Sequence, residues 1–474
     1  MWWVTGLLVI VLAFVAVICF RAIAFKPKVM EELSEEVPIL SIDKKRVIGN
    51  FQSMIRLDTL TANPEARAAF RELLPGAYPL VHEHLGFELV GAGGLLYHWK
   101  GKSKEKPTVY LSHYDVVPVE GDKWHRGPFS GDYINGEIWG RGTLDTKATL
   151  LGVLESAETL LAEGFTPAND IYFSFGGDEE TTGMDAKAIV ERLKEKGIKP
   201  ALVLDEGGAV VEGAFPGVKG QVAVIGTAEK GLLNVMFSGK SQGGHASAPP
   251  KSSLIAALSR AVLKVEKRPF KGVISPPVRQ MLDILGRYSN FGYRLMFANL
   301  WCFGGLFITL CKIIGGELNA LVRTTVAFTQ MEGSDAINVL PPSALIKANL
   351  RLMMGDTPQS AVQYLRECVN DENITITLLE GEPASSIADT DSEGYKRVHD
   401  TIRTMWPKAL VSPYLMTART DSRHFCEISK VVLRFSAMEM SSEDRKRIHG
   451  HDERISEKQL FGVIEFYQRL MRKS

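Results

Sequence analysis

The sequence predicts an α/β fold into which a second, α+β domain is inserted. Between residues 46 and 228, strand-like and helical stretches alternate, as in "TVYLSHYDVVP", "TLLGVLESAETLLAEG", "DIYFSFGG" and "ALVLDEGG". Such alternation is typical of a sheet with helices on its faces. From Glu229 the pattern of predicted elements changes to that of an α+β domain. The stretches "LLNVMFSG", "INVLPPSALIKANLRLMM" and "ITITLLEG" are strand-like and are separated by helical stretches. We expect one domain from residues 46–228 and 381–474, with residues 229–380 as the insert.

Three helices of the α/β part can be placed from apolar spacing and stop signals. The first has apolar residues at helical intervals, namely Leu150, Leu151, Leu154, Ala157 and Leu161. It should end at Gly164, because glycine commonly follows a helix. "DAKAIVERLKEKGIKP" predicts an amphipathic helix that stops at Gly197 and Pro200. "SEKQLFGVIEFYQRLMRK" predicts the last helix of the chain.

The N-terminus predicts a membrane anchor over residues 1–24. "WWVTGLLVIVLAFVAVICF", residues 2–20, carries no charge over 19 residues, which is about the length that crosses a bilayer as a helix. A cleaved signal peptide would normally show a basic start and a small-residue cleavage site, and neither is evident here. Residues 25–45, with the acidic run "EELSEEVP", are expected to form a tether. Arg21, Lys26 and Lys28 follow the span, so the positive-inside rule would place the body in the cytoplasm.

Composition excludes some function classes. The chain has 55 basic and 55 acidic residues, whereas a nucleic-acid binder usually carries a basic excess. The five cysteines are scattered along the chain, at Cys19, Cys302, Cys311, Cys368 and Cys426. Their odd number and unpaired spacing suggest neither a disulfide framework nor a thiolate metal site.

Acids and a histidine follow four of the predicted strands. These residues are His113 and Asp115, then Asp145, then Asp178, Glu179 and Glu180, then Asp205 and Glu206. A single acidic triplet is ordinarily a solvated turn. However, the carboxyl ends of strands in an open α/β sheet share the crevice where ligands bind. One imidazole among several carboxylates suits divalent cations such as Zn²⁺. A second histidine ligand is expected, and His424, His449 and His451 are its candidates.

At these residues the sequence resembles the di-zinc aminoacylase and carboxypeptidase family. The shared motifs run in order from about residue 45 to the end, as "HYD" at 113–115, "GRGTLDTK", "DEETTG", "LDEGG", "GGHASAPP", "NVLPP" and "HGHDE". The resemblance is greatest to the membrane-anchored branch of Gly-X carboxypeptidases and N-fatty-acyl-amino acid synthase/hydrolases. It implies a mixed-sheet zinc-exopeptidase catalytic domain with a ferredoxin-like lid and dimerisation domain.

The resemblance implies two Zn²⁺ ions per subunit and assigns their ligands. Asp145 would bridge the two ions. His113 and Asp205 would complete one site, while Glu180 and His449 would complete the other.

It also implies roles for the neighbours of the ligands. Asp115 would hold the ring of His113 in one tautomer, as carboxylates behind metal-bound histidines do. Glu179 would be the general base that takes a proton from the attacking water and returns it to the leaving amine. Asp178 has no assigned chemistry, and its charge suits the N-terminus of the following helix.

In the lid, the resemblance implies three further site residues and a homodimer. His245 would reach into the partner subunit's site and stabilise the oxyanion. Asn338 and Arg351 would bind substrate, and an arginine can grip a carboxylate with two hydrogen bonds.

"LMFANLWCFGGLFITLCKIIGG", residues 295–316, is almost wholly apolar and lies inside the predicted lid. Three interpretations stay open: a buried helix or dimer interface, a surface for a fatty acyl chain or the membrane, and a second membrane span. The resemblance further implies a lumenal, extracellular or periplasmic body, against the positive-inside count.

The leading functional hypothesis is a metal-dependent hydrolase of an amide bond beside a free carboxylate, in a dipeptide or an N-acyl amino acid. A reversible N-fatty-acyl-amino acid synthase is the alternative within the enzyme class. A catalytically silent binding module on the same fold is the alternative outside it, and the intact Glu179 argues against that.

Overall fold

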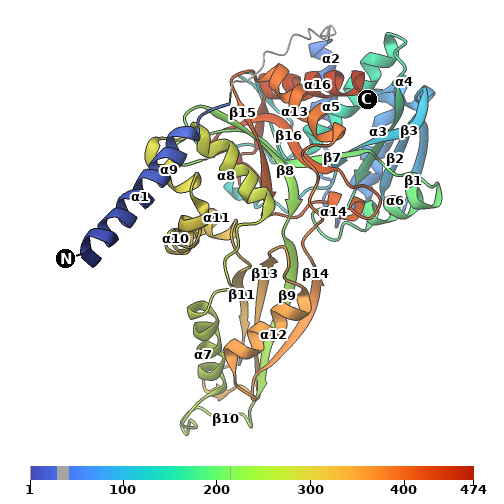
Figure 1. Cartoon of the computed structure of the whole chain (residues 1–474). Coiled ribbons are helices and arrows are strands. Elements are labelled where there is room, and N and C mark those ends of the chain that lie inside the picture. The colour runs from blue at the N-terminus through green and yellow to red at the C-terminus, as the bar shows by residue number, and fades with distance from the viewer. Residues whose placement is uncertain (1, 29–41, 214) are drawn as a thin grey trace.

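The computed structural model describes residues 2–28, 42–213 and 215–474. It shows a large α/β body, a smaller sheet domain that extends from it, and an N-terminal helix that projects outward (Figure 1). This arrangement confirms the expected α/β fold with an inserted α+β domain. Most of the predicted tether, including "EELSEEVP", lies outside the described residues.

An eight-stranded mixed sheet forms the centre of the body. Its strands, in spatial order, are β1 (Gly86–Val90), β2 (Gly94–Trp99), β6 (Asn169–Gly176), β3 (Ser103–His113), β7 (Leu202–Glu212), β16 (Val432–Met440), β8 (Gln221–Glu229) and β15 (Leu410–Met416). The central strands β6, β3, β7 and β16 run parallel to one another. Their buried residues form nearly continuous apolar runs, as expected for strands covered on both faces. The carboxyl ends of β3 and β6 therefore open at the same edge of the sheet.

Helices cover both faces of this sheet. Those of the body are α2 (Lys44–Ile55), α3 (Pro64–Ala77), α4 (Pro79–His84), α5 (Lys147–Ala162), α6 (Met184–Glu195), α13 (Glu393–Met405), α14 (Ser422–Phe425), α15 (Ser442–Arg447) and α16 (Glu457–Arg472). The three helices placed from sequence are α5, α6 and α16. α5 packs closely on α16, because Gly152 leaves room that a side chain would take from Val463.

Small elements complete the body near its loops. β4 (Tyr133–Ile134), β5 (Glu137–Trp139) and β17 (Arg454–Ser456) form a three-stranded sheet, and a short 3₁₀ helix spans Gly121–Lys123. The pairing of β5 with β17 brings the segment before "GRGTLDTK" next to the segment after "HGHDE".

The lid contains a four-stranded antiparallel sheet and two helices. Along the chain its elements are β9 (Gly231–Lys240), α7 (Leu254–Lys267), β11 (Thr325–Glu332), β13 (Ser343–Leu352), α12 (Pro358–Val369) and β14 (Thr375–Glu382). The spatial order β11-β13-β9-β14 and the β-α-β-β-α-β sequence are those of a ferredoxin-like domain. Residues of β13 alternate between buried and partly exposed, as expected where helices cover one face. At the tip, β10 (Gly244–His245) pairs with β12 (Val339–Leu340).

The apolar segment within the lid sequence forms part of a helical excursion that packs on the body. It comprises α8 (Pro276–Tyr288), α9 (Phe291–Phe297), α10 (Leu300–Ile314) and α11 (Gly316–Ala320). α8 contacts β15 at the edge of the large sheet, and side chains from α8, α9 and α10 share an apolar cluster with Val222 and Leu415. Residues 276–320 thus interrupt the lid in sequence but not in space (Figure 1).

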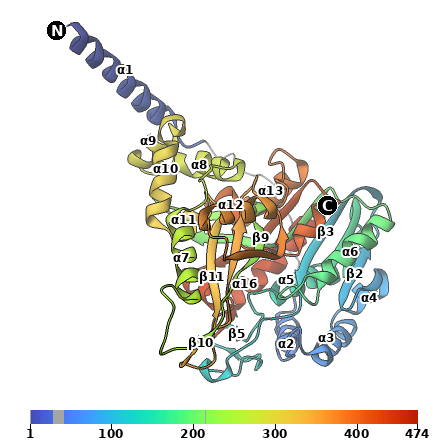
Figure 2. The same ribbon diagram turned by 90° about the horizontal axis from the view of Figure 1, so that it is seen from below.

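The N-terminal helix α1 (Trp2–Ala24) is apolar and projects away from the body (Figure 2). Within the described chain it is the one helix long and apolar enough to cross a membrane by itself. α9 and α10 would pass that test only together, and they are bent by 110° at their junction.

Candidate metal centre

Two histidines face opposite oxygens of one carboxylate. His113 ends β3, and its Nε2 lies 3.2 Å from Asp145 Oδ1. His449, in the loop after α15, places its Nε2 3.1 Å from Asp145 Oδ2. The same nitrogen is 3.2 Å from Glu180 Oε1. A carboxylate between two imidazoles is suited to bridging two cations, and of the three candidate histidines His449 is the one next to Asp145.

Ligand atoms gather in two overlapping groups around His113. In the first group, atoms of His113, Asp145 and Glu180 lie within 4.8 Å of one another. In the second, the same limit holds for His113, Glu179 and Glu206. Imidazole nitrogens and carboxylate oxygens are ligands that Zn²⁺ accepts. The donor set therefore fits a divalent metal centre.

The electrostatics of the cluster show carboxylates crowded into a small volume. Burial, together with the nearby Asp145 carboxylate, raises the pKa of Glu206 to about 8. Burial also raises the pKa of Glu179 well above its usual range. Hydrogen bonds to Asp145 and Glu180 raise the pKa of His449 to about 10. Acids placed this close favour protons or cations between them, because their charges repel.

Asp115 joins His113 to the acidic loop after β6. Its Oδ1 lies 3.4 Å from Nδ1 of His113, and its backbone oxygen lies 3.0 Å from the same nitrogen. Its two carboxylate oxygens also accept hydrogen bonds from the backbone N–H groups of Glu179 and Glu180, each at 3.1 Å. One buried residue thus orients the histidine, through its backbone and side-chain oxygens, and positions both glutamates.

Asp178 serves the start of α6. Its carboxylate accepts hydrogen bonds from the backbone N–H of Met184 at 2.9 Å and of Asp185 at 3.1 Å. These are unpaired donors of the first helical turn, where a negative charge is favourable. The three acids of "DEETTG" therefore separate into one helix-start residue and two residues of the cluster.

Asp205 lies differently from the expectation for a ligand of the His113 site. Its carboxylate accepts hydrogen bonds from the backbone N–H groups of Glu206 and Ser422, both at 2.9 Å. Glu206 instead places Oε1 3.1 Å from Nε2 of His113. Neighbouring side chains of a strand point to opposite faces, so a sequence of two adjacent acids does not reveal which one faces the histidine.

Glu453, the last residue of "HGHDE", holds the loop that carries Asp145. It is buried, and its carboxylate contacts Arg141 Nη1 at 2.7 Å and accepts hydrogen bonds from the N–H groups of Leu144 and Asp145. Sequence reasoning gave this residue no role. The sequence offered only an acid at the end of "HGHDE" and an arginine within "GRGTLDTK", and their pairing and burial are seen in the structure.

Two of the lid residues expected at the site, His245 and Asn338, lie apart from the cluster of their own chain. His245 and Asn338 are exposed at the tip, where the N–H of Ala246 donates to the Asn338 backbone oxygen at 3.0 Å. Figure 1 shows this tip at the end of the lid that points away from the body. Arg351 is half-buried on β13, and burial together with nearby Arg419 lowers its pKa.

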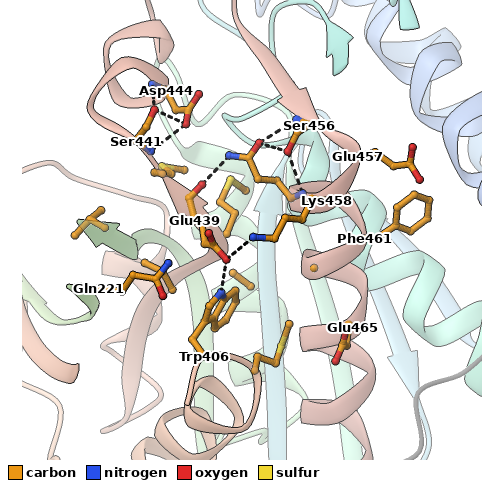
Figure 3. Close-up of a pocket in the computed structure, with 18 of the residues that line it drawn as sticks. Gln221, Trp406, Glu439, Ser441, Asp444, Ser456, Glu457, Lys458, Phe461 and Glu465 are labelled. Atoms are coloured by element: carbon orange, nitrogen blue, oxygen red, sulfur yellow. Dashed lines mark hydrogen bonds and ion pairs between the residues drawn. The ribbon is translucent and has the colours of Figure 1, made fainter. Parts of the chain in front are cut away.

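A cavity of about 880 Å³ with both polar and apolar lining residues lies elsewhere in the body (Figure 3). On its wall, Glu439 accepts hydrogen bonds from Trp406 Nε1 at 3.1 Å and from Lys458 Nζ at 3.0 Å. None of the candidate site residues lines it. The metal cluster is therefore distinct from this cavity.

Comparison with known proteins agrees with this geometry. The sequence model of peptidase family M20/M25/M40 matches residues 109–473, which include every motif from "HYD" to "HGHDE". The chain belongs to this family. Members of the M20 family are metal-dependent, and the chain is accordingly a metal-dependent hydrolase of the M20 metallopeptidase type.

Similar M20 proteins carry two kinds of name. A probable carboxypeptidase S-like 2 of Dictyostelium discoideum is 34% identical over 417 residues, covering 85% of this chain and 79% of that protein. An N-fatty-acyl-amino acid synthase/hydrolase, PM20D1 of Xenopus tropicalis, is 32% identical over 443 residues, covering 91% and 86%. Both names fall in the branch that the sequence resembles.

A solved M20 structure shares the fold. The metallo-carboxypeptidase Sso-CP2 of Sulfolobus solfataricus has a TM-score of 0.66 at 16% identity, covering 91% of this chain and 99% of that one.

Proposed function

We propose that this M20 protein hydrolyses an amide bond adjacent to a free carboxylate, in a dipeptide or an N-acyl amino acid. The observation that carries the proposal is the placement of Asp145, whose two oxygens face His113 at 3.2 Å and His449 at 3.1 Å. Two Zn²⁺ ions would be held by His113, Asp145, Glu180 and His449, with one carboxylate of the Asp205–Glu206 pair. When bound, the ions would polarise the scissile carbonyl and ease loss of a proton from water.

Glu179 is proposed to move the proton. It shares the second ligand group with His113 and Glu206, and Asp115 fixes its backbone N–H. A carboxylate in that position can accept a proton from the attacking water and deliver it to the nitrogen of the leaving amine. Burial favours the protonated form that must exist between these two transfers.

Substrate binding is proposed to involve the lid and a second subunit. Arg351 offers a half-buried cation that suits the substrate carboxylate, whereas nearby Arg419 already pairs with Glu382 at 3.4 Å. His245 and Asn338 lie at the exposed tip, far along the lid from the body (Figure 1). A homodimer would let this tip complete the partner's site, where His245 would stabilise the oxyanion.

The second candidate function is reversible synthesis and hydrolysis of N-fatty-acyl amino acids. It is supported by the relatives named for this activity, which are 31–33% identical over most of their length. Condensation uses the same groups as hydrolysis, run in the opposite direction. The complete ligand cluster and Glu179 argue against a silent binding module.

We further propose that α1 anchors the protein in a membrane with the body on the lumenal, extracellular or periplasmic side. Side chains along α1 are largely exposed, with Trp2 and Trp3 each 92% exposed. Water is a poor environment for such a helix, whereas a bilayer would solvate it. Protease that reaches the body only from the cytoplasmic side would contradict this orientation.

The function is tested by metal analysis and turnover of the full-length protein. A dipeptide and an N-oleoyl amino acid serve as substrates, each assayed for cleavage and for condensation. Glu179→Ala should keep its metal and lose most activity, whereas exposed Glu393→Gln should behave as the wild type. Absence of metal and of turnover on both substrates would rule out the enzyme, and near-normal turnover of Glu179→Ala would exclude Glu179 as the base.

A further inference from the structure

α10 presents an apolar face to the outside of the molecule. Its exposed large apolar residues are Trp301 (61%), Leu306 (51%), Leu310 (38%), Ile313 (74%) and Ile314 (66%). Phe307 and Cys311 on its other side are buried against the body. Leu306, Leu310 and Ile313 recur at helical spacing and so share one face. A face of this kind usually contacts a partner or a membrane, and it excludes the fully buried helix among the three sequence interpretations.

The apolar face of α10 begins next to the residues through which the body contacts α1. Arg21 Nε donates to Asn299 Oδ1 at 3.1 Å, and Asn299 Nδ2 donates to the backbone oxygen of Ile18 at 3.0 Å. The rings of Phe14 and Trp301 meet edge to face, with centroids 5.9 Å apart. α1 and the start of α10 are therefore held in a fixed relation (Figure 2).

The contact between Phe14 and Trp301 sets the depth of the start of α10. Arg21 is the first charged residue after the apolar run, and Phe14 precedes it by seven residues. At the rise of an α-helix this separation is about 10 Å along the axis. If α1 crosses a bilayer, Phe14 lies below the headgroups, and Trp301 lies beside it.

Cationic side chains surround the base of α1. Arg21, Lys28 and Arg279 line a cavity of about 730 Å³ at the base of α1, together with Arg287 and the acids Asp283 and Asp391. Arg287 stacks its guanidinium over Phe25 at 4.4 Å and also pairs with Asp283 at 2.9 Å. The excess of cations over acids at this level suits contact with the phosphate groups of lipid headgroups.

We propose that α10 lies in the plane of the membrane, at the boundary between headgroups and acyl chains of the leaflet that α1 leaves. The occupant of the apolar face is a phospholipid bilayer. The proposal rests on anchorage by α1, proposed above. A second span does not fit, because α10 has 15 residues, about 22 Å of helix, and the hydrocarbon core is about 30 Å thick. Trp301 lies at the start of α10, and its place at the boundary of headgroups and acyl chains agrees with the preference of tryptophan for the membrane interface.

Quenching of tryptophan fluorescence by brominated lipids tests this directly. Full-length protein is placed in nanodiscs of anionic phospholipid with bromine on the acyl chains. The fluorescence lost in Trp301→Phe, taken as a difference from wild type, reports Trp301 alone. We expect that difference signal to be strongly quenched in brominated discs. Trp406→Phe is the matched control, since Trp406 is buried in the body, and its difference signal should be unchanged.

Two results would overturn the inference, and they are distinguishable. Trp2 and Trp3 are isolated in the same way, by a Trp2→Phe/Trp3→Phe variant. Quenching of Trp2 and Trp3 without quenching of Trp301 would keep the anchor and reject the in-plane helix, and particle mass would show whether a second copy covers α10. If brominated lipid quenches none of Trp2, Trp3 and Trp301, the proposal that α1 is a membrane anchor is itself rejected. Ile313→Asp should reduce the quenching of Trp301 and leave that of Trp2 and Trp3 unchanged.

Discussion

Glu453 fixes the loop of Asp145 by accepting a hydrogen bond from the Asp145 backbone N–H at 3.2 Å. Glu453 follows His449 by four residues, so the segment that supplies one proposed ligand also positions another. Arg141 neutralises the buried carboxylate at 2.7 Å and donates to the Gly450 backbone oxygen at 2.6 Å. The two ends of the proposed two-ion site are thus coupled through one buried ion pair.

Glu453→Ala should therefore weaken both metal binding and the fold. Removing one partner leaves the Arg141 charge buried and unpaired, which costs about 3–5 kcal/mol. We expect a lower melting temperature and a lower metal content after dialysis, measured together on the same sample. Glu457→Gln is the matched control, because Glu457 is near in sequence but pairs with Lys44 at the surface. Wild-type metal content in Glu453→Ala would show that the loop holds its position without this pair.

The choice between Asp205 and Glu206 can be decided by metal stoichiometry. Glu206 approaches His113, whereas Asp205 accepts hydrogen bonds from backbone N–H groups. Glu206→Gln should therefore lose about half of the bound metal, since binding needs a charged carboxylate. Asp205→Asn keeps an acceptor for Ser422 and should retain the metal. The reverse result would assign the ligand to Asp205.

His245 offers a test of the proposed dimer. Glu179→Ala and His245→Ala chains carry different tags, and the mixed dimer is purified through both. If the tip serves the partner, one site of the mixed dimer is intact, and its turnover should be about half that of wild type. Each variant alone should be nearly inactive. An inactive mixed dimer would place His245 in the site of its own chain.

Lys230 should make stability depend on pH. It lies where β8 leads into β9, buried, with its ammonium donating to the backbone oxygens of Ala320 and Arg323. Burial and nearby Arg351 lower its pKa to about 7, partly opposed by Asp356. The unfolded chain therefore binds more protons between pH 7 and the ordinary lysine range, and the free energy of unfolding should rise with pH there.

The slope from one group is at most about 1.4 kcal/mol per pH unit. Lys230→Met should remove that contribution, and denaturant unfolding at pH 7 and pH 9 measures it. Lys240→Met, at the exposed far end of β9, is the control. Equal pH dependence in wild type and Lys230→Met would contradict the lowered pKa.

The elements and the position of the cluster could be predicted because they depend on local patterns. Strand ends placed His113 and Glu180 at one edge, and apolar spacing placed α5 and α16. The packing of residues 276–320 on the body could not be predicted, because an apolar sequence pattern does not identify the surface against which it packs. Glu453 and Glu206 depend on pairings across distant segments, and a single sequence does not contain those distances.

The hydrogen bond from Asn299 to the backbone oxygen of Ile18 also limits how far the body can rotate relative to its membrane helix. A chain joined to its membrane helix only by a polar tether would swivel and sample many heights. Here Asn299 and Trp301 hold the helix through Arg21 and Phe14. The metal cluster should therefore keep a constant distance from the lipid surface and a constant orientation relative to it. Substrates would then meet it from a preferred direction, whether they arrive by diffusion in water or along the bilayer.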